Sequence, residues 1–240
     1  MSPRVRAASA VDRCERTLRR AILSGSLPPG ARLPPEREHA EQLAVNRTTL
    51  RAALSRLASA KLVSVRQGSG YVVLDYRRHA GLEVLSELAE IAEAEGRAPF
   101  ALIRDVLELR RRLAQMALER IAAREGHVDT RPLEAAIDAF EAHQDDTSDE
   151  LARCDLACTA EVLALTGSEV MGLLLNPIGT LIHSLAPLRE AIYRDPRSNV
   201  RGYRALLAWL DTRSHAALPL VLGELERRDA DTLTWITGST

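Results

Sequence analysis

The chain has 240 residues, of which 46% are hydrophobic and 27% are charged, a globular composition that excludes long-range disorder and suits one large or two ordinary domains. The net charge of −1 conceals an asymmetry, because residues 1–78 hold 15 basic and 6 acidic side chains and the remainder is acidic. A basic first third with an acidic remainder favours a nucleic-acid-binding domain joined to one that avoids nucleic acid.

Neither a membrane span nor a secretion signal is predicted. No stretch approaches the roughly 18 apolar residues of a transmembrane helix, and the first eight or so residues are small and basic, without the apolar run of a signal peptide. Three cysteines, Cys14, Cys154 and Cys158, are too few and too irregularly spaced for a zinc ribbon or a disulfide framework. We therefore expect a cytoplasmic protein without a membrane partner.

Short elements follow one another in the first third of the chain. Helical spacing and capping residues predict helices over residues 11–24, 33–43 and 47–57. A tight turn at 44–46 ends in Asn46, the candidate N-cap of the helix over 47–57. Two β-rich runs, 62–66 and 71–74, are separated by Gln67-Gly68-Ser69-Gly70, which favours a hairpin. Helix, turn, helix and hairpin in this order predict a winged helix-turn-helix.

The helix over 47–57 has two contrasting faces. One carries an apolar stripe at a spacing of three and four residues, made by Leu50, Ala53, Leu54 and Leu57. The first turn and the other side carry Arg47, Thr48, Thr49 and Arg51. Such residues suit a recognition helix in the major groove, although arginines on an isolated helix more often form a solvated face.

These elements resemble the DNA-binding domain of the GntR family of bacterial transcription regulators over roughly residues 9–75. The resemblance rests on Gly25, Leu27-Pro28-Pro29-Gly30, Leu33-Pro34, Glu36-Arg37, Arg47-Thr48-Thr49-Leu50-Arg51, Leu57, Gly68 and Gly70. It implies groove contacts by Arg37, Arg47, Thr48, Thr49 and Arg51, with Gln67 and Gly68 at the wing tip reaching the adjacent minor groove. We expect a homodimer on a pseudo-palindromic, double-stranded operator, because one recognition helix reads only a few base pairs.

The remainder of the chain is predicted to be an all-α antiparallel bundle. We place the DNA-binding domain at 1–76, a linker at 77–81, and a ligand-binding and dimerisation domain at 82–240. Its expected helices span residues 82–91, 100–124, 131–144, 149–166, 168–186, 197–212, 214–227 and 229–237. Pro219 is expected to kink its helix.

Residues 80–237 resemble the helical ligand-binding domain of the FadR subfamily of GntR regulators. Many members hold a divalent metal with an aspartate, a histidine four residues later, and two histidines from later helices. This chain keeps Asp155 but places Thr159, Arg204 and Glu224 at the histidine positions. Because a guanidinium cannot ligate a metal, we expect no metal and no cofactor, with Arg204 complementing Asp155 and Glu224.

The other histidines of this region, which lack ligand spacing, are expected to be surface or capping residues. They are His127, His143, His183 and His215.

Without the metal-binding histidines, this region resembles the metal-free branch of the subfamily. In that branch, a cavity in the helical domain accepts the acyl chain of a long-chain acyl-CoA. The matching stretches include Gly81-Leu82, Gly172 to Asn176, Gly202-Tyr203 and Trp235. Arg110 and Arg204 are the candidate cations for an acidic effector, either an acyl-CoA or another organic acid. Both arginines could equally be salt-bridge partners, and the helical domain could serve dimerisation alone.

An enzyme is disfavoured by the absence of the common catalytic motifs. The sequence contains no glycine-rich phosphate loop after a strand, no nucleophile elbow and no His-Glu-x-x-His. It also offers no carboxylate pair in a plausible cleft. We therefore expect a ligand-responsive transcription regulator.

Overall fold

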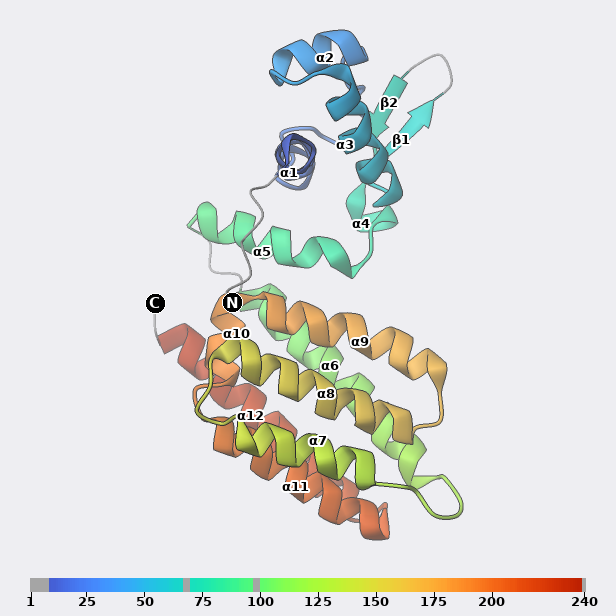
Figure 1. Ribbon diagram of the computed structural model, residues 1–240, viewed down its shortest axis with the longest axis vertical. Helices are drawn as coiled ribbons and strands as arrows, with labels where there is room; N and C mark the ends of the chain where they lie inside the picture. Colours follow the sequence, from blue (N-terminus) through green and yellow to red (C-terminus); the bar gives the residue numbers. More distant parts are fainter. Residues whose placement is uncertain (1–8, 67–69, 97–99, 239–240) are drawn as a thin grey trace. The chain divides into compact units, whose positions relative to one another are not determined.

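The computed structural model describes residues 9–66, 70–96 and 100–238. The chain divides into two compact units, Met1–Arg97 and Ala98–Thr240. Figure 1 shows the first as helices with a two-stranded hairpin and the second as helices alone. The predicted fold class, a winged helix-turn-helix followed by an all-helical domain, is confirmed.

The first unit opens with the three helices of the helix-turn-helix. α1 (Ala10–Leu23) begins with a reciprocal cap, because the Ser9 hydroxyl accepts from the backbone N–H of Asp12 and the Asp12 carboxylate accepts from that of Ser9. α2 (Glu36–Gln42) is followed by α3 (Arg47–Ser59), whose cap is the predicted Asn46. The apolar stripe of α3 is at most 1% exposed and packs in the core that α1 shares, as the spacing predicted.

The wing is a two-stranded antiparallel sheet of β1 (Val63–Arg66) and β2 (Gly70–Val73), in which Val63 pairs with Val73. Gly70 has a φ of +75°, a left-handed conformation that a glycine adopts without strain. Val63 and Val73 are buried against α3, so one end of the hairpin is fixed to the helical core.

Three short helical elements complete the first unit: α4 (Tyr76–His79), a 3₁₀ turn (Leu82–Val84) and α5 (Leu85–Ala94). The sequence assigns the segment from residue 82 to the second domain, but here Val84 and Ile91 belong to the core of the first unit. Glu87 of α5 also lies 3.6 Å from the guanidinium of Arg19 on α1. The apolar stripe of α5 thus packs onto α1.

The second unit is a bundle of seven helices within the described chain. They are α6 (Phe100–Ala122), α7 (Arg131–Ala142), α8 (Ser148–Leu165), α9 (Glu169–Ser184), α10 (Ala186–Ile192), α11 (Pro196–Thr212) and α12 (Leu218–Gly238). Its main core includes Ile121, Leu133, Ile137 and Phe140, none of which is exposed to solvent.

Three details of the predicted bundle are wrong. α10 is a separate helix, bent by 95° from α9, where one helix ending near 186 is expected. The expected helices 214–227 and 229–237 are one continuous helix, α12. Pro219 lies in the first turn of α12, where a proline costs no internal hydrogen bond, so it starts the helix and does not kink it.

A helix that crosses a bilayer needs about 20 consecutive, mainly apolar residues. Within the residues described, no single helix is long and apolar enough to cross a bilayer, although α9 and α10 would pass that test if taken together.

Candidate DNA-binding surface and ligand cavity

α3 presents two arginines on its solvent-facing side. The Arg47 and Arg51 side chains are 63% and 65% exposed, and Thr48 beside them is also exposed. Thr49 differs from this set, because it is only 9% exposed and its backbone N–H is 2.7 Å from the Asn46 side-chain oxygen. Of the predicted contacts on α3, Arg47, Thr48 and Arg51 are therefore the ones free to reach a groove.

Glu36 at the start of α2 holds both arginines on the same side. Its carboxylate accepts from Arg51 Nη2 at 2.7 Å and Nε at 3.3 Å, and lies 4.0 Å from Arg47 Nη2. The hydrogen bond from Arg51 lowers the pKa of Glu36, so the carboxylate is ionised at neutral pH. This pairing sets the direction of the guanidinium groups before any DNA is bound.

The remaining predicted DNA contacts lie on α2 and the wing. Arg37 is 82% exposed and lies 3.7 Å from Glu41 on its own helix. Gln67 and Gly68 lie outside the described residues. Arg66, at the end of β1, is exposed and adds a cation at the base of the hairpin tip.

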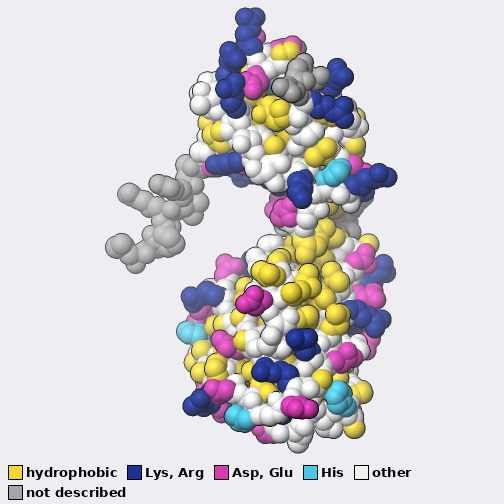
Figure 2. All heavy atoms as spheres, turned by 90° about the vertical axis from the view of Figure 1, so that its right-hand side faces the viewer, with side chains coloured by type: hydrophobic (Ala, Val, Ile, Leu, Met, Phe, Trp, Pro, Cys, Tyr) yellow, Lys and Arg dark blue, Asp and Glu magenta, His cyan; other side chains and the backbone are white. Residues whose placement is uncertain are grey.

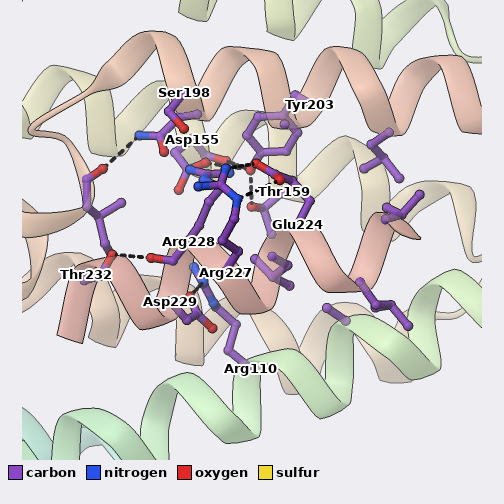
Figure 3. Close-up of a pocket in the computed structure, with 18 of the residues that line it drawn as sticks. Arg110, Asp155, Thr159, Ser198, Tyr203, Glu224, Arg227, Arg228, Asp229 and Thr232 are labelled. Carbon is purple, nitrogen blue, oxygen red and sulfur yellow. Dashed lines mark hydrogen bonds and ion pairs between the residues drawn. The ribbon is translucent and has the colours of Figure 1, made fainter. Parts of the chain in front are cut away.

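The second unit contains a cavity of about 350 Å³ between α6, α8, α11 and α12 (Figure 3). Four predicted ligand residues line it: Arg110, Asp155, Tyr203 and Glu224. Asn176, Arg204 and Trp235 do not. Much of the wall is aliphatic, with Leu118, Val162, Leu175, Leu206, Val221 and Leu222 among its members.

Asp155 is the centre of a buried hydrogen-bond network at this cavity. Its Oδ1 accepts from the Tyr203 hydroxyl at 2.6 Å and its Oδ2 from the Tyr193 hydroxyl at 2.8 Å. The Thr159 hydroxyl lies 3.0 Å from the Tyr203 oxygen, and His183 Nε2 is 3.4 Å from Oδ2. Burial by itself raises the pKa of Asp155, but His183 and the two tyrosines outweigh it and hold the pKa well below its usual range.

The sequence missed two members of this network. His183, expected at the surface, has a side chain only 9% exposed that stacks on the Tyr193 ring with centroids 5.6 Å apart. Tyr193 lies on the turn after α10, and no motif in the sequence points to it. Buried Leu181 and Ile182 precede His183, which was a local sign of its burial, but nothing local indicated that it meets Asp155.

The residues around Asp155 do not fit a divalent cation. Both carboxylate oxygens already accept from tyrosine hydroxyls, and the wall adds the hydroxyl of Thr159. In the described part of the chain, no group of three His, Cys, Asp or Glu residues is placed to hold a metal. Asp155 is therefore satisfied by protein donors alone.

Arg110 and Asp229 form a second buried pair at the cavity. Arg110 donates to Oδ1 of Asp229, whose side chain is 3% exposed, and Arg111 Nε lies 3.6 Å from Oδ2. Burial raises the pKa of Asp229, against the opposing effect of these two guanidinium groups. Arg110 thus lines the cavity, as expected, with its charge already engaged.

The predicted role of Arg204 is wrong. Its Nη2 donates to Asp138 and Glu141 of α7, each at 2.6 Å, and it complements neither Asp155 nor Glu224. Neighbouring residues of a helix point about 100° apart, so with Tyr203 directed at Asp155, Arg204 faces α7. Arg228 lines the cavity instead, although it was not among the predicted ligand residues.

Different family models match the two units of the chain. Residues 10–73 match the model described as bacterial regulatory proteins, gntR family, and residues 105–224 match the FCD domain. The chain is 45% identical over 103 residues to the HTH-type transcriptional regulator Mce2R of Mycobacterium tuberculosis, covering 41% of this chain and 42% of that protein. It thus spans less than half the length of that relative.

A longer match links the chain to a fatty acid metabolism regulator protein of Edwardsiella ictaluri. The two are 33% identical over 172 residues, which is 72% of this chain and 69% of the relative. Among solved structures, that of Lar, titled as controlling expression of the Listeria monocytogenes agr system, is similar with a TM-score of 0.61 and 13% identity, covering 97% of this chain and 98% of that one. At that identity the likeness shows the fold alone.

Proposed function

From the premise that this chain belongs to the GntR family of bacterial transcription regulators and carries an FCD domain, we propose that it binds a pseudo-palindromic operator as a homodimer in the cytoplasm and responds to a small acidic metabolite. It is a DNA-binding transcription regulator, and its relatives are named as regulators and not as enzymes.

The DNA-binding part of the proposal is supported mainly by the pairing of Glu36 with Arg47 and Arg51. Guanidinium groups fork onto the edge of guanine or onto phosphate, and those already directed outward lose less freedom on binding. Arg37, Thr48 and the wing add contacts beside them in this proposal. Thr49 does not contact DNA in this proposal. Its side chain packs in the protein, and its backbone N–H donates to the Asn46 cap.

The dimer part is supported by an apolar face on α6 and α9, two helices that contact each other. Its members are Leu109, Met116, Val170, Leu173 and Leu174, each at least 42% exposed. Figure 2 shows hydrophobic side chains gathered as a band on one face of this unit. Large exposed apolar patches are rare on monomers, so we propose that a second copy covers this face.

The effector part is supported by the cavity, which combines aliphatic walls with arginines. The relative named as a fatty acid metabolism regulator favours an effector related to fatty acids, either the free acid or its CoA ester. The competing proposal is that the helical unit serves dimerisation alone. An effector changes DNA affinity only if it binds the DNA-competent and DNA-incompetent states unequally. Operator affinity should therefore depend on the effector under the first proposal and should not under the second.

The test begins with selection of operators from random duplexes by the full-length protein. We expect an inverted repeat whose half-sites are about 34 Å apart, one turn of DNA, bound by two chains as measured by light scattering. Titration of that operator with and without fatty acids and their CoA esters then tests the response. Binding of one chain to an asymmetric site, or the same affinity with every compound, would contradict the proposal.

A further inference from the structure

Five arginines line the cavity, and most of them are already neutralised. Arg110 pairs with Asp229, Arg201 lies 3.4 Å from Asp195, and Arg227 lies 2.6 Å from Glu224 and 3.0 Å from Asp231. Arg194 is exposed at the rim. Arg228 remains: it is half-buried, and among the described residues Glu224 and Asp229 attract its charge without forming a salt bridge with it.

Arg228 is directed across the cavity by a glycine on the facing helix. A Cβ atom on Gly202 would lie 2.7 Å from Arg228 Nη1 and 3.7 Å from its Cζ, so the guanidinium rests against the backbone of α11. Figure 3 shows the side chain reaching from α12 toward α11, beside Tyr203. Any other residue at 202 would push the charge out of this position.

The surroundings of Arg228 indicate which kind of ligand would neutralise its charge. A planar guanidinium pairs with a carboxylate through two parallel hydrogen bonds. Away from this charge, much of the wall is aliphatic, with Val162, Leu206 and Val221 among its members. The acidic side chains that also line the cavity are already engaged by tyrosines or by other arginines. We infer that the cavity binds the free form of a compact aliphatic monocarboxylic acid, with the carboxylate on Arg228 and the chain among the leucines and valines.

The volume restricts the ligand further. At roughly 30 Å³ for each non-hydrogen atom, the volume of a water molecule, a cavity of about 350 Å³ holds on the order of a dozen such atoms. A medium-chain acid such as octanoate fits this space, and only the free acid offers Arg228 a carboxylate, because the thioester of a CoA ester carries no charge there. Among the described residues, Arg228 is the one interior arginine of the cavity without a salt bridge, which matches a ligand with one negative charge. This inference rests on the proposed function for its biological role, but the site can be measured without DNA.

The experiment is calorimetric titration of the full-length protein with octanoate, octanamide and octanoyl-CoA. Four proteins are compared: the wild type, Arg228→Gln, Gly202→Ala and the control Arg204→Gln, which removes an arginine of α11 that lies outside the cavity and faces α7. We expect octanoate to bind the wild type and octanamide and octanoyl-CoA to bind at least about tenfold more weakly. Loss of a charged hydrogen bond should weaken octanoate binding to Arg228→Gln by about 10- to 150-fold, with Arg204→Gln unchanged within about twofold.

Gly202→Ala separates a binding effect from a folding effect. Alanine is the better residue inside a helix, so Tm should stay equal or rise while octanoate affinity falls because Arg228 is displaced. No octanoate binding to the wild type, equal binding to Arg228→Gln, or tighter binding of octanoyl-CoA would each overturn the inference.

The operator titration distinguishes this inference from the proposed function. If octanoate binds through Arg228 but leaves operator affinity unchanged, the proposed response fails and the site stands. If octanoyl-CoA alone changes operator affinity, the response stands and the inference is overturned.

Discussion

Replacement of Arg51 by alanine should separate base reading from general charge attraction. In the free protein, Arg51 makes a solvent-exposed pair with Glu36. Solvent screens an exposed ion pair, so its loss changes stability and Tm little. The fold should therefore survive the substitution almost unchanged.

The expected effect on DNA binding is much larger. A bidentate contact to guanine is worth about 1 to 3 kcal/mol, which corresponds to a change of about 5- to 150-fold in Kd. Arg56→Ala is the matched control: it lies on the same helix, about 140° around the axis, and pairs with Asp12 at 2.7 Å and Glu15 at 3.2 Å. It removes the same charge from a different side.

Fluorescence anisotropy of the selected operator and a scrambled duplex, at about 150 mM salt, measures both variants. We expect Arg51→Ala to lose operator affinity and keep its weak binding to the scrambled duplex, while Arg56→Ala changes operator affinity by less than about threefold. Equal losses in both variants would show that only net charge matters, and the assignment of α3 as the reading helix would be refuted.

Three further predictions concern the dimer, the pH response and metal. Leu173→Glu, at a site 75% exposed on the apolar face, should give monomers in sedimentation, whereas Leu220→Glu, 77% exposed on α12, should not; dimers in both variants would exclude this face. Burial lowers the pKa of His39 from 6.5, so the unfolded chain takes up a proton that the folded chain does not, and stability should fall as pH drops through 6.5. Denaturant titrations above and below that pH should show a smaller loss for His39→Leu, and an equal loss would refute the assignment. Because Asp155 is satisfied by tyrosines, untreated protein should contain no stoichiometric divalent ion in elemental analysis, and a chelator should leave Tm unchanged; a bound ion would contradict this.

Local features of the first unit were predictable from the sequence. The stripe from Leu50 to Leu57 and the cap at Asn46 depend on residues within a few turns of one another, so spacing alone identifies them. Thr49 shows the limit of this reasoning. It belongs to the same DNA-contacting residue types as Thr48, but its position on the helix turns it toward the core.

The ligand cavity was less predictable, because its members come from distant helices. Asp155 was identified on α8, but its partners His183 and Tyr193 reach it from the last turn of α9 and the turn after α10, and no sequence spacing encodes that meeting. The prediction that Arg204 lies in the ligand cavity was wrong for the same reason, and Arg228 lines the cavity instead. Helical phase relative to a neighbouring helix decides which arginine faces the cavity, and it depends on packing across the whole bundle.

The most direct test of a ligand-responsive regulator is reciprocity between its two ligands. Octanoate affinity is measured by calorimetry on the free protein and on the protein saturated with operator, and operator affinity is measured with and without saturating octanoate. Linkage requires both ratios to be the same, and we expect a factor of about 5 to 150, absent in Arg228→Gln. Octanoate that binds free and operator-bound protein equally well would contradict the account.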